Sequence, residues 1–258
     1  MRVSLIQLDV DLSVPKADRL AEALRLVRER EDDHLVVLPE LWLPGGWDYA
    51  RWDEDAETLD GPTAQALAEA ARDAGVWLHG GSIVERGDDG AHYNTSLVFA
   101  PDGALRATYR KIHRFGFDSG EAALMGPGAD IVTLATPFGT LGLATCYDLR
   151  FPEMFRLLLD SGAEVLVVPA AWPARRVEHW RLLARARAVE NQVFVLACNT
   201  SGSQAGMAQG GYSVVVDPWG EIVAEAGPEG RVLTAEIDTA LVAKTRADFP
   251  VLKDRRLG

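Results

Sequence analysis

Cysteine is scarce in this chain of 258 residues, which contains only Cys146 and Cys198. The N-terminal segment MRVSLIQLDVDLS has too short an apolar run for a signal peptide, and it lacks a small-residue cleavage site. Two cysteines without an export signal are typical of a reducing cytosol in which thiols stay free. We therefore expect a cytoplasmic protein, and packing, metal binding or catalysis remain as roles for Cys146.

Basic residues are fewer than acidic ones, and long apolar runs are absent. The chain has 26 Lys and Arg against 38 Asp and Glu, so its formal net charge is -12. An acidic surface repels phosphate backbones and anionic lipid, which argues against nucleic acid or membrane partners. No stretch approaches the roughly 18 apolar residues that a membrane-spanning helix needs. The histidines are scattered and neither cysteine has a Cys or His neighbour at ligand spacing, so we expect no metal and no other cofactor.

No linker rich in Pro, Gly or Ser divides the chain, so we expect one domain over residues 1–258. Continuous apolar runs rich in β-branched residues predict strands that are buried on both faces. These runs cover residues 34–38, 164–168 and 193–198. Helical patterns, some bounded by Pro at the start and Gly at the end, cover residues 16–30, 62–74, 152–160 and 178–190.

Turn sequences separate further pairs of strand-like runs. They are Pro101-Asp102-Gly103, Pro137-Phe138-Gly139 and Asp217-Pro218-Trp219-Gly220. The total is roughly a dozen strands, and a strongly twisted open sheet rarely exceeds about ten. The sequence therefore predicts an α/β fold of the αββα sandwich type, in which two mixed β-sheets pack face to face and helices cover both outer faces.

One segment is echoed later in the chain. LVVLPELW at 35–42 and VLVVPAAW at 165–172 both read strand, Pro, two residues and Trp. A duplicated half-domain would explain the echo, and so would a chance similarity of two buried strands. By the echo, Trp172 has the place after its strand that Trp42 has, so the two Pro-to-Trp loops are expected at the same edge of the double sheet.

Cys146 follows the apolar run Leu141 to Thr145 and precedes the helix predicted from Pro152. Backbone amides at such a junction are unpaired, and the geometry can expose a nucleophile at the edge of a sheet. A catalytic cysteine also needs a base or a cation beside it, because the free thiol is mostly un-ionised near neutral pH. The alternative is a small buried hydrophobe. For Cys198, inside the continuous strand VFVLACN, packing is the expected role.

Two other side chains directly follow predicted strands. Glu40 ends a buried strand in LPELW, at the kind of edge where α/β sites form. Lys111 follows a strand in YRKIHRF. Taken alone, Glu40 could open a surface loop and Lys111 could belong to a solvated basic cluster.

Taken together, these motifs resemble the nitrilase superfamily of carbon–nitrogen hydrolases. The resemblance rests on a glutamate after strand-Pro, a lysine in Y-R-K-x-H and a cysteine in C-Y-D-x-R-F-P-E, in that order. It extends to HWRLLARARAVENQVFVLACN (179–199) and DPWGEI (217–222). It implies the αββα sandwich, catalytic Glu40, Lys111 and Cys146, and a second glutamate a few residues before Pro-Gly, which falls on Glu121.

The resemblance implies a cysteine amidase. Glu40 would take the thiol proton, Cys146 would attack an amide carbonyl, and Lys111 with the Tyr147 backbone N–H would hold the oxyanion. Water would then hydrolyse the thioester after ammonia leaves. Nitrile hydrolysis, N-carbamoyl amine or amino-acid hydrolysis and acyl transfer on the same fold remain open. A catalytically silent binding module is disfavoured, because all four catalytic residue types are present.

The segment WPARRVEHW, residues 172–180, bears on the substrate. An acidic protein needs a local cation to hold an anion, and the Arg fork suits a carboxylate. The segment also resembles that of omega-amidase-like members of the family, which hydrolyse short dicarboxylic acid monoamides. In those members an Arg follows W-P-A-x, and here that residue is Arg176. We therefore predict a small ω-amide with a free carboxylate, contacted by Arg176, Trp172 and Tyr147. Two solvated arginines, Arg175 and Arg176, are the alternative.

The resemblance also implies self-association. The expected partner is a second copy of the chain, giving a homodimer or a higher homo-oligomer. The helix at 152–160 and the C-terminal tail are the expected contact elements.

Overall fold

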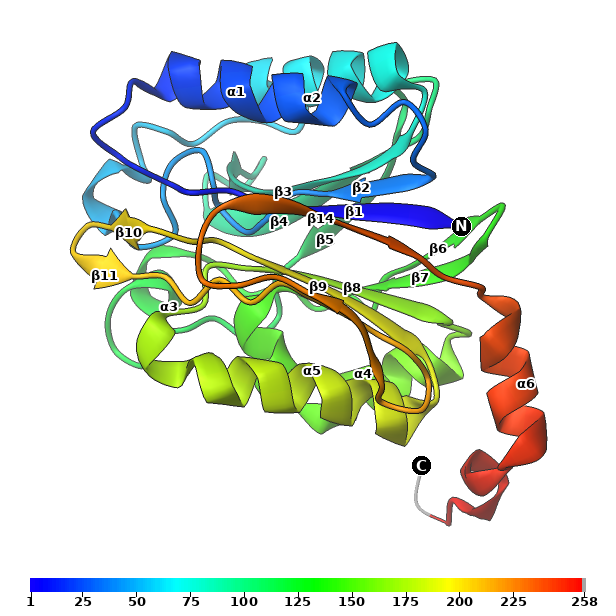
Figure 1. Ribbon diagram of the computed structural model, residues 1–258. Helices are drawn as coiled ribbons and strands as arrows, with labels where there is room; N and C mark the ends of the chain where they lie inside the picture. The colour runs from blue at the N-terminus through cyan, green and yellow to red at the C-terminus, as the bar shows by residue number, and fades with distance from the viewer. Residues whose placement is uncertain (257–258) are drawn as a thin grey trace.

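The computed structural model describes residues 1–256, so the last two residues of the predicted 1–258 domain lie outside the described residues. Two six-stranded β-sheets pack face to face (Figure 1). Helices α1 (Lys16–Arg28) and α2 (Pro62–Ala74) cover the outer face of one sheet. Helices α4 (Pro152–Asp160) and α5 (Val177–Asn191) cover the outer face of the other. The predicted αββα sandwich is confirmed.

The first sheet has the strand order β14-β1-β2-β3-β4-β5. Its strands are β1 (Arg2–Gln7), β2 (Leu35–Val37), β3 (Trp77–Arg86), β4 (His92–Phe99), β5 (Leu105–Arg110) and β14 (Arg231–Glu236). The neighbours β1, β2 and β3 run parallel, and the other pairings are antiparallel. The sheet is therefore mixed, as predicted, and β4–β5 is the hairpin predicted around residues 101–103.

The second sheet repeats this plan in the order β13-β12-β9-β8-β7-β6. Its strands are β6 (Thr133–Thr136), β7 (Gly139–Leu143), β8 (Val165–Ala170), β9 (Phe194–Asn199), β12 (Val214–Val216) and β13 (Ile222–Glu225). Strands β7, β8 and β9 run parallel and the rest are antiparallel. The echoed segments thus occupy equivalent places, because β2 and β8 are each the middle strand of a parallel trio.

The remaining elements are short or peripheral. They are β10 (Ser203–Gln204), β11 (Met207–Ala208), α3 (Glu121–Leu124), α6 (Ala240–Asp248) and the 3₁₀ turns η1 (Tyr49–Arg51), η2 (Cys146–Arg150), η3 (Ala174–Arg176) and η4 (Val251–Asp254). Helix α6 carries the chain away from the sandwich toward its C-terminal end (Figure 1). Between residues 1 and 256, no helix has both the length and the apolar character needed to cross a bilayer.

The middle strands are apolar throughout because both of their faces are covered. In β2, Val37 packs between the two sheets, whereas its neighbour Val36 packs under the outer helices with Leu67 of α2. Side chains of a strand alternate between its faces, so an uninterrupted apolar run fits a strand with two covered faces. Cys198 of β9 lies between the sheets, where its thiol donates to the carbonyls of Ile6 at 3.5 Å and Val37 at 3.4 Å.

Candidate active site

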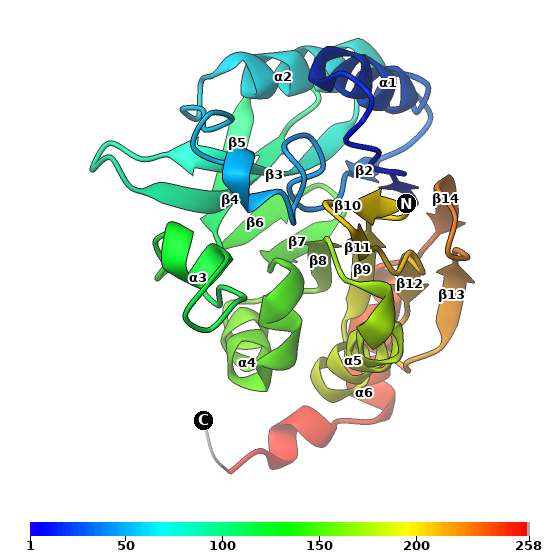
Figure 2. The ribbon, with the colours of Figure 1, turned by 90° about the vertical axis from the view of Figure 1, so that its left-hand side faces the viewer.

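Glu40, Lys111 and Cys146 come from three different strand ends. Glu40 follows β2 by three residues, Lys111 follows β5 directly, and Cys146 opens η2 three residues after β7. These ends meet at one edge of the sandwich, on the side where α3 and the β10–β11 hairpin lie (Figure 2). Both sheets therefore contribute to one site.

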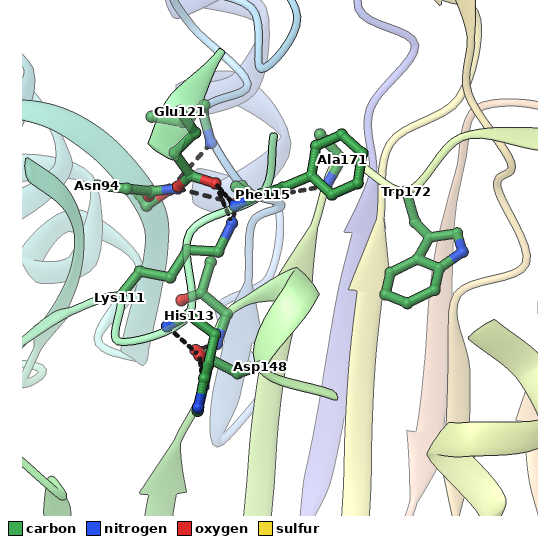
Figure 3. A network of polar contacts seen from close by, with 12 residues as sticks. Asn94, Lys111, His113, Phe115, Glu121, Asp148, Ala171 and Trp172 are labelled. Carbon is green, nitrogen blue, oxygen red and sulfur yellow. Dashed lines mark hydrogen bonds and ion pairs between the residues drawn. The ribbon is translucent and has the colours of Figure 1, made fainter. Parts of the chain in front are cut away.

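Lys111 lies between two carboxylates in a region nearly closed to water. Its Nζ is 2.7 Å from Glu40 Oε1 and 2.8 Å from Glu121 Oε2. The Lys111 side chain is 2% exposed and those of Glu40 and Glu121 are each 5% exposed. Asn94 of β4 donates from Nδ2 to both carboxylates at 2.8 Å (Figure 3). Asn94 has no sequence signal of such a role, because one Asn in a strand does not stand out from its neighbours.

Backbone amides fix the second oxygen of Glu40 and one oxygen of Glu121. Glu40 Oε2 accepts a hydrogen bond from the Ala171 N–H at 2.8 Å. Glu121 Oε2 accepts one from the Phe115 N–H at 2.8 Å. Ala171 belongs to the second echoed segment, so the loop after β8 orients the carboxylate that follows β2. The two Pro-to-Trp loops lie at the same edge, as the echo predicted.

Burial and charge set the protonation states of this cluster. Burial raises the pKa of the Cys146 thiol well above its usual value, the charge of Glu40 raises it further, and Lys111 opposes both. Burial would lower the pKa of Lys111, but the charges of Glu121 and Glu40 outweigh it, so that pKa lies well above the usual value. Burial also raises the pKa of Glu121, and Lys111 opposes this shift. Cys146 is therefore a thiol at rest, beside a lysine that stays cationic.

The turn that carries Cys146 is tight. The residue has φ of +48°, in the left-handed region that side chains other than glycine rarely adopt. Thr145 and Asp148 form a capping box around it, in which the Thr145 N–H donates to Asp148 Oδ2 at 2.8 Å. The helical turn thus begins at Cys146, six residues before the helix predicted from Pro152.

Asp148 also ties this turn to the Lys111 segment. Its carboxylate is fully buried and accepts hydrogen bonds from the Tyr109 hydroxyl at 2.7 Å and from the His113 N–H at 2.9 Å. The His113 ring nitrogen Nδ1 lies 2.8 Å from Asp148 Oδ1 (Figure 3). Tyr109 and His113 bracket Lys111 in sequence, so Asp148 fixes Lys111 relative to Cys146.

The cluster borders a cavity of about 440 Å³, part of which is open to solvent. Glu40, Lys111, Glu121 and Cys146 all line it. Its remaining walls are mostly aromatic, with two guanidinium groups among them. These residues are Trp47, Tyr49, Trp52, Phe115, Tyr147, Trp172, Arg150 and Arg176.

Arg150 and Arg176 have no carboxylate within 4.0 Å among the described residues. The Arg176 guanidinium lies 5.1 Å from the Phe115 ring centroid, and that of Arg150 lies 4.7 Å from the Trp172 ring centroid. Burial, then the charges of Arg175 and Arg150, lower the pKa of Arg176. Two uncompensated cations in one cavity form a place for an anion. Arg150 is a cavity residue without a predicted role, although it lies in the same C-Y-D-x-R-F-P-E motif as Cys146.

The other predicted contact residues also lie at this cavity. Trp172 is buried, and its indole N–H donates to the Arg176 carbonyl at 2.8 Å, which holds η3 in place. Tyr147 is half-buried, with its ring centroid 5.3 Å from that of Phe115. Arg175 is exposed and does not line the cavity. Within residues 1–256, no group of three or more His, Cys, Asp and Glu side chains is arranged to hold a metal ion.

Known proteins similar to this chain match it along nearly its whole length. The family model described as Carbon-nitrogen hydrolase matches residues 2–247. A 2-oxoglutaramate amidase from Paenarthrobacter nicotinovorans is 43% identical over 261 residues, which cover 98% of this chain and 89% of the relative. The omega-amidase NIT2 of Mus musculus is 40% identical over 270 residues, which cover 99% and 95%. Saccharomyces cerevisiae Nit3, a solved member of the nitrilase superfamily, has a TM-score of 0.87 at 34% identity, covering 100% of this chain and 97% of that one.

Proposed function

The chain belongs to the carbon–nitrogen hydrolase family, and on that premise we propose that it hydrolyses the terminal amide of a small carboxylated amide. The reaction passes through a thioester on Cys146 and releases ammonia. The 2-oxoglutaramate amidase and the omega-amidase among its relatives support both the amide and the carboxylate.

In the first step, the Cys146 sulfur attacks the amide carbon while Glu40 takes the thiol proton. The raised pKa of Cys146 supports this order, because a neutral thiol becomes a good nucleophile when a base removes its proton during attack. The carbonyl oxygen becomes an oxyanion, which receives hydrogen bonds from the Lys111 ammonium and the Tyr147 N–H. Loss of one such donor typically costs a factor of about 10²–10³ in turnover.

In the second step, the carbon–nitrogen bond breaks and the nitrogen leaves as ammonia with the proton that Glu40 carried. Water then attacks the thioester, Glu40 takes a proton from that water, and the departing sulfur recovers a proton from Glu40. Glu121 acts through Lys111. Its 2.8 Å contact with Nζ keeps the lysine charged and directed at the oxyanion position.

The arginine pair is the observation that carries the substrate assignment. Arg150 and Arg176 line the cavity that contains Cys146 without a carboxylate partner among the described residues, in a protein of net charge -12. Such a protein repels anions at long range, so two local cations without carboxylate partners support a substrate that supplies a carboxylate. A 2-oxo acid monoamide such as 2-oxoglutaramate has this carboxylate and a terminal amide.

Ammonia release from a substrate panel tests the proposal. The panel contains 2-oxoglutaramate, a neutral amide of similar length, an N-carbamoyl amino acid and a nitrile. We expect the carboxylated amide to have the highest kcat/KM. Cys146→Ala should abolish turnover, and Cys198→Ala should retain it, because that thiol only packs between the sheets. Preference for the N-carbamoyl acid would instead indicate N-carbamoyl amino-acid hydrolysis. Full turnover in Cys146→Ala would refute the mechanism.

Self-association through the outer face of the second sheet is part of the proposal. Several large apolar side chains are exposed there. They are Leu157 of α4, Leu182 and Val189 of α5, and the stacked pair Trp219 and Phe249. Apolar side chains exposed on one side of a protein are typical of a surface that contacts another chain, so they support contact with a second copy. The two free cysteines support the cytoplasmic location that the sequence predicts.

A further inference from the structure

Tyr49, the first residue of η1, lies in the cavity wall and takes no part in the steps above. Its ring is half-buried and is held by aromatic contacts. The ring centroid lies 4.8 Å from that of Trp52, edge to face, and 6.2 Å from that of Trp47. These contacts hold the ring in a fixed position in the cavity wall.

The Tyr49 hydroxyl is free to bind a ligand. Among residues 1–256 it makes no hydrogen bond, whereas the indole N–H groups of the neighbouring tryptophans are all occupied. Trp47 donates to the Ala171 carbonyl, Trp52 to that of Gly45 and Trp172 to that of Arg176, at 2.8–2.9 Å. The tryptophans offer a ligand only apolar surface, so the hydroxyls that the lining residues leave for hydrogen bonding are those of Tyr49 and Tyr147.

The two tyrosines have different neighbours in the cavity wall. Tyr49 packs on Trp47 and Trp52, whereas Tyr147 packs on Phe115 and Phe151. Burial, followed by the charges of Glu121 and Glu40, raises the pKa of Tyr49, so its hydroxyl stays protonated. Tyr49 therefore offers a neutral hydroxyl to the acid–base cluster.

Gly120 gives the Tyr49 phenol its place beside Glu121. A Cβ at this position would lie 3.0 Å from Tyr49 Cζ and 3.1 Å from its hydroxyl oxygen. Gly120 also has φ of +59°, which favours glycine. The phenol thus packs directly on the backbone of the segment that carries Glu121.

We propose that the Tyr49 hydroxyl accepts a hydrogen bond from the nitrogen of the scissile amide, and then from the water that replaces ammonia. This role rests on the proposed function. Lys111 and the Tyr147 N–H serve the carbonyl oxygen, and Glu40 faces the lone pair that it must protonate. The amide N–H groups still need an acceptor that does not remove their protons, and a neutral phenol meets that requirement.

Tyr49→Phe tests the role, because it removes the hydroxyl and keeps the ring contacts with Trp52 and Trp47. The two probes are 2-oxoglutaramate and the corresponding terminal methyl ester, whose leaving oxygen carries no hydrogen. We expect kcat/KM for the amide to fall about three- to tenfold, as for the loss of one neutral hydrogen bond. The ester should change by less than twofold, because kcat/KM reports only the steps up to thioester formation.

Tyr93→Phe is the matched control. That hydroxyl bonds to exposed Asp89 outside the cavity, so both kcat/KM values and the melting temperature should stay at wild-type values. Unchanged amide hydrolysis by Tyr49→Phe, or an equal loss on amide and ester, would overturn the role while leaving the proposed function standing. Wild-type protein that cleaves neither probe would refute the proposed function and this role together.

Discussion

Lys111 illustrates how the site depends on matched charges. A buried ammonium or carboxylate loses the hydration that it has in water, and only partners close at hand compensate for that loss. Here one ammonium and one amide side chain, Asn94, serve two carboxylates. Removal of the lysine therefore leaves Glu40 and Glu121 buried together without their shared cation.

This asymmetry makes Glu40→Gln and Lys111→Met different tests of the site. Gln keeps the shape of the side chain and an oxygen for the Ala171 N–H, so we expect a melting temperature close to wild type and a loss of turnover by orders of magnitude. Lys111→Met should also lose turnover, and it should lower the unfolding free energy by about 3–5 kcal/mol, the cost of breaking a buried ion pair. Calorimetry together with ammonia release would measure both effects. Two variants that melt alike would contradict the charge argument.

Arg176 and its neighbour Arg175 provide a variant and its control, since only Arg176 lines the cavity. Arg176→Ala should raise KM for the carboxylated amide about tenfold or more, because a charged hydrogen bond contributes about 1.5–3 kcal/mol. A neutral amide should be affected little, and Arg175→Ala should behave like wild type on both substrates. Steady-state kinetics of the two variants would measure this. An equal loss on both amides would exclude an anchoring role for Arg176.

For single residues, sequence motifs predict much of the site, because this chemistry needs particular side chains at strand ends. The motifs predict Glu40, Lys111, Glu121 and Cys146 as site residues, and the structure brings them into one cavity. Asn94 could not be foreseen, since its function depends on two carboxylates that meet only after folding. Arg150 was visible in its motif, but its lack of an acidic partner was not.

Among the elements, β3 has an irregular stretch next to the site. Its pairing with β4 shifts register between His79 and Ser82, and Gly81 within this stretch has φ of +70°. A Cβ on Gly81 would lie 2.0 Å from the Pro39 carbonyl oxygen, so glycine allows the close approach of the segment that carries Glu40. His79 is fully buried there, and no described residue is hydrogen-bonded to its Nε2.

Burial lowers the pKa of His79 to about 4, compared with its ordinary value of 6.5. The folded state therefore prefers the neutral ring, and His79 contributes stability that is fully present above pH 6.5 and is lost as pH falls toward 4. The loss amounts to about 3 kcal/mol over that window. Urea unfolding of wild type and His79→Asn at several pH values should show the wild-type advantage shrinking as pH falls. A constant difference would contradict the assignment.

The boundaries of helices and strands can be predicted where a residue such as Pro marks them in the sequence. Helices α2 and α4 both begin with Pro and lie at the predicted 62–74 and 152–160, while α1 ends two residues early and α5 extends one residue further at each end. The three predicted buried strands are present with ends shifted by one or two residues. Helix α6 has no counterpart in the sequence prediction, because it buries only Val242 and Thr245 and so shows no regular apolar pattern.

In the whole molecule, the outer surface of α5 is the region where the predicted self-association can be tested most directly. Leu182 is 67% exposed on α5, one heptad before exposed Val189. Leu182→Glu should lower the mass of the assembly in analytical ultracentrifugation, because a charge replaces an apolar contact, and the melting temperature of the dissociated chain should change little. Leu105→Glu, on β5, is the control and should keep the wild-type mass. A wild-type protein that sediments as a monomer would contradict the predicted self-association.

The equivalence of the two sheets lets the enzyme be divided into complementary fragments. A cut between exposed Ala129 and Asp130 would leave Glu40 and Lys111 on one piece and Cys146 on the other. Strand β14 of the second piece pairs with β1 of the first along Arg2–Gln7, which gives the fragments a specific seam for reassembly (Figure 1). Neither fragment alone should release ammonia, whereas co-expression should restore release, and turnover would then report the meeting of any two proteins fused to the pieces.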